Sequence, residues 1–160
     1  MSALVSKEDA RDLPLAAEGD EAAARRLYAR YEPAISGQMW RFSRDPIVHQ
    51  ELVQEVWVSV FLSLAKFRGQ APFLHWIRRI ATHTGYRFWK RQARHAEQRE
   101  AYAREQHTSP QAAAPETPAD AAEQLHTLLA QLAPDYRLVL TLFYFEECSI
   151  NEIAERTGWS

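Results

Sequence analysis

The chain has 160 residues, 46% of them hydrophobic and 11% aromatic, which is enough apolar material for one ordinary domain or two small helical ones. No apolar run approaches the roughly 20 residues that span a bilayer, and Met1 to Leu15 lack the apolar core of a secretory signal, so we expect a cytoplasmic protein without membrane insertion. The single cysteine, Cys148, excludes an internal disulfide and a cysteine-rich zinc site, and it is expected to be a small buried side chain.

The net charge of −2 conceals an uneven distribution of charge along the chain. Between Glu55 and Glu97 there is no aspartate or glutamate, although eight of the 19 lysines and arginines lie there. The acidic residues are therefore all elsewhere. Such a segregation indicates that a polyanion binds at one part of the molecule only.

The first half of the chain is predicted to be helical, because glycine is scarce and apolar residues recur at spacings of three and four. Asp20 can cap a helix that runs to about Tyr31, and Pro33 is expected to open a second helical stretch. Asp45 followed by Pro46 predicts the start of the next helix, because a carboxylate caps the helix and proline suits its first position.

The helix that begins at Pro46 is expected to run to about Lys66 with a single apolar stripe. That stripe consists of Leu52, Val53, Val56, Trp57, Val60, Phe61 and Leu64. Residues 67–71 interrupt the pattern, and Pro72 restarts it as a helix that continues through the basic residues. These helices predict a first domain over residues 18–105.

A linker is predicted next, because the segment HTSPQAAAPETPA has three prolines and no large apolar residue. We place this Pro/Ala-rich linker at residues 106–119 and a second helical domain at 120–160. In that domain a leucine pattern is followed by a helix that Pro134 opens. Ser149 and Glu152 then form a capping box for a short helix over 150–157, which Gly158 ends.

The final segment, CSINEIAERTGWS, is typical of the first half of a helix-turn-helix, with a plain helical hairpin as the alternative. The recognition helix would follow Ser160, so we expect the motif to be incomplete, with Ser160 being either a natural end or a truncation. The predicted fold class is all-α, with two small helical domains joined by the linker and the second an incomplete helix-turn-helix.

The basic stretch also carries aromatic side chains between its cations. They are Phe67, Phe73, Trp76, Tyr86, Phe88 and Trp89. Lysine and arginine bind phosphates, and flat side chains stack on bases, so this mixture suits a single-stranded or melting nucleic acid. In the alternative interpretation Phe73, Trp76 and Ile80 are core residues and the charges are a solvated face.

Glu51, Gln54 and Glu55 share one face of their predicted helix, because spacings of three and four are neighbours there. An exposed helix offers neither the burial nor the further ligands that acid–base or metal chemistry needs, so a docking face for a basic partner fits better. Glu123 and His126 form the only Glu-x-x-His, whereas a di-iron bundle needs two. We therefore expect no metal, no cofactor and no catalytic residue.

Two segments resemble a known family. The segment ELVQEVWVSVFLSLAKFRGQAPFLHWIRRIATH resembles the core-binding and promoter-melting region of bacterial RNA polymerase sigma factors, particularly the extracytoplasmic-function (ECF) group. The segment LAPDYRLVLTLFYFEECSINEIAERTGWS is similar to the start of their C-terminal promoter-binding domain. The two matches cover about Asp20 to Arg94 and Leu125 to Ser160, in the family's order. This resemblance implies a transcription initiation factor that directs core polymerase to promoters and assists DNA melting, and that catalyses nothing itself.

The resemblance also implies roles for particular residues. The residues that match the segment docking on the coiled coil of the polymerase β′ subunit are Glu51, Leu52, Val53, Gln54, Glu55 and Val56. The residues that match the loop capturing a flipped base of the minus-ten element are Phe67, Arg68, Gly69 and Gln70. The helix that separates strands and contacts the duplex carries Trp76, Arg78, Arg79, His83, Arg87, Lys90, Arg91 and Arg94. The family usually has Asp in place of Glu51 and Asn in place of His83, and the second difference bears on promoter preference.

The expected partners are RNA polymerase core enzyme, promoter DNA and an anti-sigma factor. One rival hypothesis is a helix-turn-helix regulator that binds DNA but not core polymerase, and such a protein would not need the docking face or the aromatic segment. A metal-dependent helical enzyme is a more distant rival.

Overall fold

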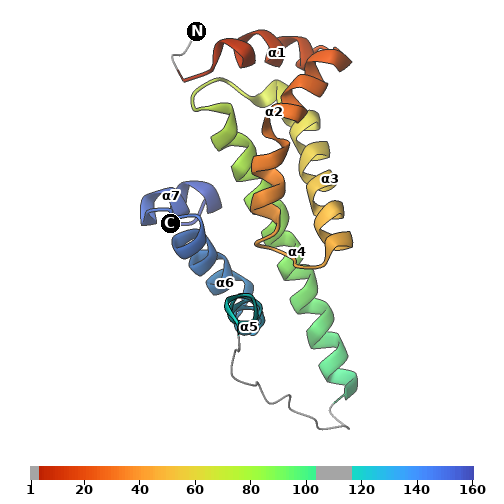
Figure 1. Cartoon of the computed structure of the whole chain (residues 1–160), viewed down its shortest axis with the longest axis vertical. Helices are drawn as coiled ribbons and strands as arrows, with labels where there is room; N and C mark the ends of the chain where they lie inside the picture. Colours follow the sequence, from red (N-terminus) through yellow and green to blue (C-terminus); the bar gives the residue numbers. More distant parts are fainter. Residues whose placement is uncertain (1–3, 104–116) are drawn as a thin grey trace. The chain divides into compact units, whose positions relative to one another are not determined.

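The computed structural model describes residues 4–103 and 117–160, and within these ranges the chain is helical and has no β-strand (Figure 1). The helices are α1 (Lys7–Ala17), α2 (Glu21–Met39), α3 (Pro46–Ser63), α4 (Phe73–Ala103), α5 (Pro118–Ala130), α6 (Pro134–Leu140) and α7 (Ile150–Thr157). A 3-10 turn, η1 (Leu64–Lys66), follows α3, and a π-helical segment, η2 (Thr141–Phe145), follows α6. The all-α prediction is confirmed.

By their internal contacts the residues divide into two compact units, which we describe separately. Unit 1 extends to Gly85 and includes Glu155–Ser160, and unit 2 is Tyr86–Ala154. Most of the predicted linker lies outside the described residues, but Pro118 and Ala119 already belong to α5. The domain ranges 18–105 and 120–160 stay a prediction.

Helix α1, the first helix of unit 1, was not predicted from the sequence. Ser6 caps it by accepting a hydrogen bond from the Asp9 amide at 3.1 Å. The helix packs on α2 and η1, and Figure 1 shows it lying across the end of unit 1 where α2 begins and α3 ends. Its inward residues are Asp9, Asp12 and Leu13, so the buried face has too little apolar character for a periodicity search to detect.

Helix α2 begins after the predicted cap, Asp20, whose carboxylate accepts from the Ala23 amide at 2.6 Å. The predicted break at Pro33 is wrong, since the helix continues through that residue to Met39. Proline removes one backbone donor from the helix. Leu27 before Pro33 and Ile35 after it are both buried in the core of unit 1. This packing stabilises the helix on both sides of Pro33 and outweighs the tendency of proline to interrupt a helix.

Helix α3 starts where it was predicted to start. The Asp45 carboxylate accepts from the Ile47 amide at 2.8 Å, and Pro46 is the first helical residue. Its apolar stripe forms the centre of the core of unit 1, where Val56 and Val60 are completely buried. Glycine at position 85 lets α4 approach the Phe42 ring, because a Cβ there would lie 2.2 Å from a ring carbon.

Unit 2 contains the second half of α4 together with α5, α6 and η2. The capping box before α7 is confirmed, since Glu152 accepts from the Ser149 amide at 2.8 Å and Ser149 Oγ accepts from the Glu152 amide at 3.3 Å. Gly158 has a φ of +75°, as the predicted left-handed cap requires. Cys148 is buried, as its isolated position in the sequence predicted.

Candidate nucleic-acid and partner interface

Three aromatic rings form a cluster where the loop after η1 meets the first turn of α4. The ring centroids of Phe67 and Phe73 are 5.2 Å apart, those of Phe67 and Trp76 are 5.4 Å apart, and those of Phe73 and Trp76 are 5.7 Å apart. Phe73 is buried, whereas Phe67 and Trp76 are half-buried. The exposed parts of Phe67 and Trp76 are therefore available for stacking, and Phe73 supports them from inside.

The loop that carries Phe67 has an exposed basic and polar edge. Arg68 and Gln70 are exposed on either side of Gly69, whose φ of +67° is a conformation that glycine adopts without strain. Lys66 is exposed at the end of η1. The loop thus presents cations beside an aromatic ring, which is the pairing that an unstacked nucleotide requires.

The predicted DNA-contacting residues of α4 in unit 1 differ in exposure. Arg79 is exposed, while Arg78 and His83 are half-buried. The Nε of Arg78 is buried and has no hydrogen-bond partner, and its backbone carbonyl accepts from Gln38 Nε2 at 3.2 Å. The side chain of Arg79 is therefore better placed than that of Arg78 to contact a phosphate.

The second half of α4, in unit 2, exposes the remaining predicted cations. Arg87, Lys90, Arg91 and Arg94 are all exposed, and spacings of three and four put them on neighbouring turns. Lys90 Nζ lies 5.3 Å from the centroid of the Tyr86 ring. A row of exposed cations on one helix without a carboxylate among them suits a phosphate backbone.

Trp89 is not available for stacking on a base, because it is 2% exposed. The guanidinium carbon of Arg137, from α6, lies 4.0 Å from the centroid of its ring, and burial lowers the pKa of Arg137 to about 10. In the same unit the Tyr86 hydroxyl donates to the Asp135 carboxylate. Burial, with this hydrogen bond, raises the pKa of Tyr86 to about 12. Tyr86 and Trp89 thus pack within unit 2. Phe67, Trp76 and Phe88 are all half-buried, and of these Phe67 and Trp76 belong to the aromatic cluster.

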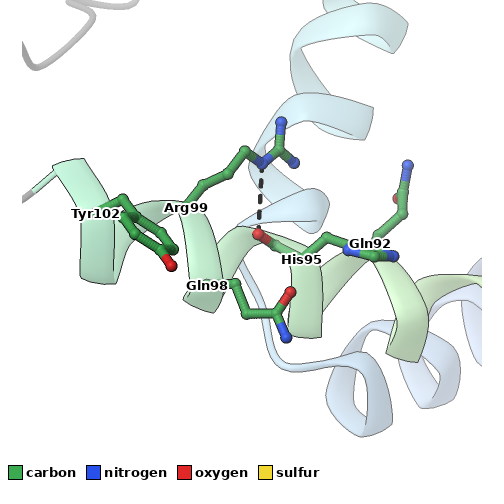
Figure 2. Close-up of a pocket in the computed structure, with 5 residues that line it drawn as sticks. All are labelled: Gln92, His95, Gln98, Arg99 and Tyr102. Atoms are coloured by element: carbon green, nitrogen blue, oxygen red, sulfur yellow. Dashed lines mark hydrogen bonds between the residues drawn. The ribbon is translucent and has the colours of Figure 1, made fainter.

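The last turns of α4 form a shallow pocket that does not qualify as a ligand site. Figure 2 shows its lining residues, Gln92, His95, Gln98, Arg99 and Tyr102. Arg99 Nε donates to the His95 carbonyl at 3.4 Å within the helix, and Tyr102 is 90% exposed. Because all five lining residues come from one helix, the described part of the chain supplies no opposite wall to enclose a ligand.

Helix α3 presents the predicted docking face to solvent. Glu51 and Gln54 are exposed and Glu55 is half-buried. The same stripe continues through Val58, which is 58% exposed, and Leu62, which is 82% exposed. Exposed branched aliphatic residues beside acidic ones indicate a protein-binding surface. Neither residue belongs to the apolar stripe predicted from the sequence, and the docking face was predicted from its polar residues alone.

The other three residues predicted to dock face inward. Leu52, Val53 and Val56 are 2%, 7% and 0% exposed and belong to the core of unit 1. A partner helix cannot reach side chains buried to this extent without displacing α3. Their direct docking stays a prediction that their burial does not favour.

Two classes of feature are absent from the described residues. Nowhere in 4–103 and 117–160 do three or more His, Cys, Asp or Glu side chains gather in a way that could hold a metal ion. Among these residues no helix is both long enough and apolar enough to cross a membrane.

Comparison with known families matches both halves of the chain. The model of Sigma-70 region 2 matches residues 27–95, and the model of Sigma-70 region 4 matches residues 122–160. The first range contains the aromatic cluster and the α3 docking face, and the second contains α6 and the capped helix α7. The two matches lie on either side of the predicted linker.

Curated relatives agree with these matches. The RNA polymerase sigma factor CarQ of Myxococcus xanthus is 31% identical over 146 residues, which cover 89% of this chain and 81% of CarQ. The chain belongs to the RNA polymerase sigma factors, in the extracytoplasmic-function group. The RNA polymerase sigma factor YlaC of Bacillus subtilis is 28% identical, covering 84% of this chain and 79% of YlaC. The ECF sigma-E factor of Haemophilus influenzae is 33% identical over 48% of this chain and 40% of its own.

A solved structure supports the same fold for this sigma factor. CnrH, determined in complex with the cytosolic domain of CnrY, superposes with a TM-score of 0.58 over 96% of this chain and 85% of CnrH, at 22% identity. Sigma factors direct RNA polymerase core enzyme to promoter DNA, so the expected function and the two expected principal partners are confirmed. The rival hypothesis of a regulator that does not bind core polymerase is not favoured.

Proposed function

We propose that this sigma factor docks on core polymerase through the exposed stripe of α3 and opens promoters with the loop at Phe67 and the cations of α4. The stripe consists of Glu51, Gln54, Glu55, Val58 and Leu62. The β′ coiled coil is the docking partner that the resemblance implies. The factor itself performs no bond chemistry, since the polymerase that it directs supplies the active site.

The observation that carries the melting role is the cluster at the start of α4. Extrusion of a base from a duplex costs a few kcal/mol, and an aromatic face recovers part of that cost by stacking. Phe67 and Trp76 supply partly exposed rings, and Lys66, Arg68 and Arg79 supply exposed cations nearby in the sequence. Rings and cations together suit the single-stranded product of melting.

The test is the substitution Phe67→Leu, which keeps apolar volume against Phe73 but removes the flat ring. We expect promoter opening, measured by permanganate footprinting at equal core occupancy, to fall about fivefold or more, because stacking contributes about 1–3 kcal/mol per base. Tyr102→Ala, which removes an exposed aromatic ring of α4 far along the chain from the Phe67 loop, serves as the control and should open the promoter normally. Wild-type opening by Phe67→Leu would make Phe67 a packing residue only.

We also propose that the chain works in the cytoplasm, where the polymerase is, and that an anti-sigma factor regulates it. Its fold resembles that of CnrH, whose solved structure contains the cytosolic domain of a partner protein. An acidic and apolar stripe on α3 is a surface that such a regulator could cover, which would prevent docking on the polymerase.

A further inference from the structure

The N-terminal helix α1 carries two carboxylates that lie in the interior of unit 1. Asp12 is fully buried and accepts hydrogen bonds from Arg26 Nη2 at 2.8 Å, from Arg30 Nη2 at 3.0 Å and from Arg11 Nε at 3.0 Å. Hydrogen bonds from Arg26 and Arg11 hold the pKa of Asp12 well below its usual range. Asp12 thus anchors α1 to α2 by charge.

Asp9, one turn earlier, has different partners. It is 2% exposed, and it accepts hydrogen bonds from Arg30 and from the Tyr31 hydroxyl. Burial of the Tyr31 phenol, followed by its hydrogen bond to Asp9, raises the pKa of Tyr31 above its usual range, so the phenol is neutral and acts as the donor. Asp9 therefore fixes the position of the Tyr31 ring as well as anchoring α1.

The Tyr31 ring connects this bond to the candidate DNA-binding loop. Its centroid lies 5.3 Å from that of Phe73 in an edge-to-face arrangement, and Phe73 is in the same kind of arrangement with Phe67. Edge-to-face pairs are directional, so a shift of one ring changes the preferred place of the next. The carboxylate of Asp9 and the ring of Phe67 are thus joined by two intervening aromatic side chains.

Helix α1 also reaches the loop by a second route. It packs on η1, the turn that immediately precedes Phe67. Just before α1, Val5 lies beside Gly69, since a Cβ on that glycine would be 3.6 Å from a Val5 methyl group. In Figure 1 the loop from η1 to α4 lies directly beneath α1. The two routes leave the loop little freedom to move independently of α1.

We propose that Asp9 and Tyr31 are positioning residues that set Phe67 for promoter opening, so that α1 controls the melting loop. This inference rests on the proposed role of Phe67. A hydrogen bond from a half-buried hydroxyl to a buried carboxylate is directional and costly to break. Its loss releases the Tyr31 ring, and Phe73 and Phe67 shift with it, without a change on the α3 docking face.

The test compares three conservative variants in the full chain. Asp9→Asn weakens the hydrogen bond between Asp9 and Tyr31, and Tyr31→Phe removes it. Asp12→Asn removes a buried carboxylate of the same helix that does not contact Tyr31. At equal core occupancy, we expect the first two to lower promoter opening about fivefold, because a hydrogen bond to an ionised carboxylate is one of the stronger kind. Asp12→Asn should lower opening less than about twofold, because Asp12 does not hold the Tyr31 ring. The double variant Asp9→Asn/Tyr31→Phe should be no worse than the worse single variant.

A second measurement reports on the environment of the Phe67 ring directly. With 4-fluorophenylalanine at position 67, the ¹⁹F signal of the free protein should shift or broaden in Asp9→Asn and Tyr31→Phe but stay in place in Asp12→Asn. An unmoved signal in the first two, or equal loss of opening in all three, would overturn the inference. Phe67→Leu in the same opening assay distinguishes a wrong role for Phe67 from a wrong role for α1. If Phe67→Leu opens the promoter normally, the proposed role of Phe67 is wrong. If Phe67→Leu reduces opening but Asp9→Asn does not, only the proposed role of α1 is wrong.

Discussion

Single residues show how this small fold uses charge inside its core. Asp12 has no exposed surface, yet it remains ionised because three arginines donate to it from two helices. Removal of an arginine from such a group leaves the Asp12 carboxylate buried without full compensation, which is more damaging than removal of an exposed ion pair. The exposed pair of Arg25 and Glu21 is the natural contrast in the same unit.

The first residue-scale prediction concerns acid stability. The pKa of Asp12 is lower in the folded chain than in the unfolded chain, because Arg26 and Arg11 donate to the carboxylate. Its stabilising effect is therefore complete above about pH 4, near the pKa of a free aspartate, and is lost as the pH falls below that value. In urea denaturation followed by circular dichroism, Asp12→Asn should be less stable than wild type at pH 7 and should lose less of its remaining stability towards pH 2.5.

Glu8→Gln is the matched control for this prediction, since Glu8 is an exposed carboxylate on the same helix. Its stability should follow the wild-type pH profile closely. If Asp12→Asn and wild type lost stability in parallel between pH 4 and pH 2.5, the arginine contacts of Asp12 would not be what keeps its carboxylate ionised.

At the scale of elements, local capping signals in the sequence predicted the starts of α2, α3 and α7. Asp45 with Pro46 and Ser149 with Glu152 mark helix starts within four residues of sequence, and the structure has both. Helix α1 escaped prediction, although Ser6 caps it, because its buried face holds carboxylates whose partners include Arg26 and Arg30 of α2. Continuity through Pro33 likewise depends on tertiary packing, which outweighs a local preference.

The candidate site also has features that the sequence predicted and features that it could not predict. Spacing along α3 was enough to put Glu51 and Gln54 on one exposed face, because a regular helix fixes which residues are neighbours. Spacing could not show that Trp89 is covered by Arg137, or that Leu62 has no core to join. The first fact depends on two residues 48 positions apart in the chain, and the second depends on which neighbours the fold brings to Leu62.

The element-scale prediction is that α3 docks by its exposed stripe. Glu51→Lys should weaken binding to core polymerase, chiefly by slowing association at low salt, because charges at an interface rim act mainly on encounter. Leu62→Ala should weaken binding by faster dissociation while changing stability by less than about 0.5 kcal/mol, since the side chain is 82% exposed. Surface plasmon resonance against immobilised core enzyme measures both rates.

Glu21→Lys makes the same charge change on α2 and is the control for Glu51→Lys, since its side chain is 79% exposed. It should bind core polymerase as wild type does. Equal weakening by the two substitutions would mean that net charge, and not the α3 stripe, governs association.

The whole molecule combines an acidic body with one basic stretch, and this arrangement separates its two binding tasks. Eight cations lie between Glu55 and Glu97 with no carboxylate, so DNA phosphates meet attraction there and repulsion over most of the remaining surface. A protein with the same net charge spread evenly would bind DNA weakly in many orientations. We expect segregation instead to favour the orientation in which the basic stretch faces the promoter.

The whole-molecule prediction follows from counterion release. Each cation that neutralises a phosphate adds about 0.9 to the slope of log affinity against log salt on duplex DNA, or about 0.7 on a single strand. The triple variant Arg79→Gln/Lys90→Gln/Arg94→Gln removes three exposed cations of α4, so the slope for promoter binding by the holoenzyme should fall by about 2 to 3. Lys7→Gln/Arg25→Gln/Arg44→Gln removes the same charge from exposed positions outside the stretch and should leave the slope unchanged. Because the two triples have the same net charge, equal slopes would show that the position of the cations on α4 is irrelevant, whereas a loss confined to the first triple locates the phosphate contacts on that helix.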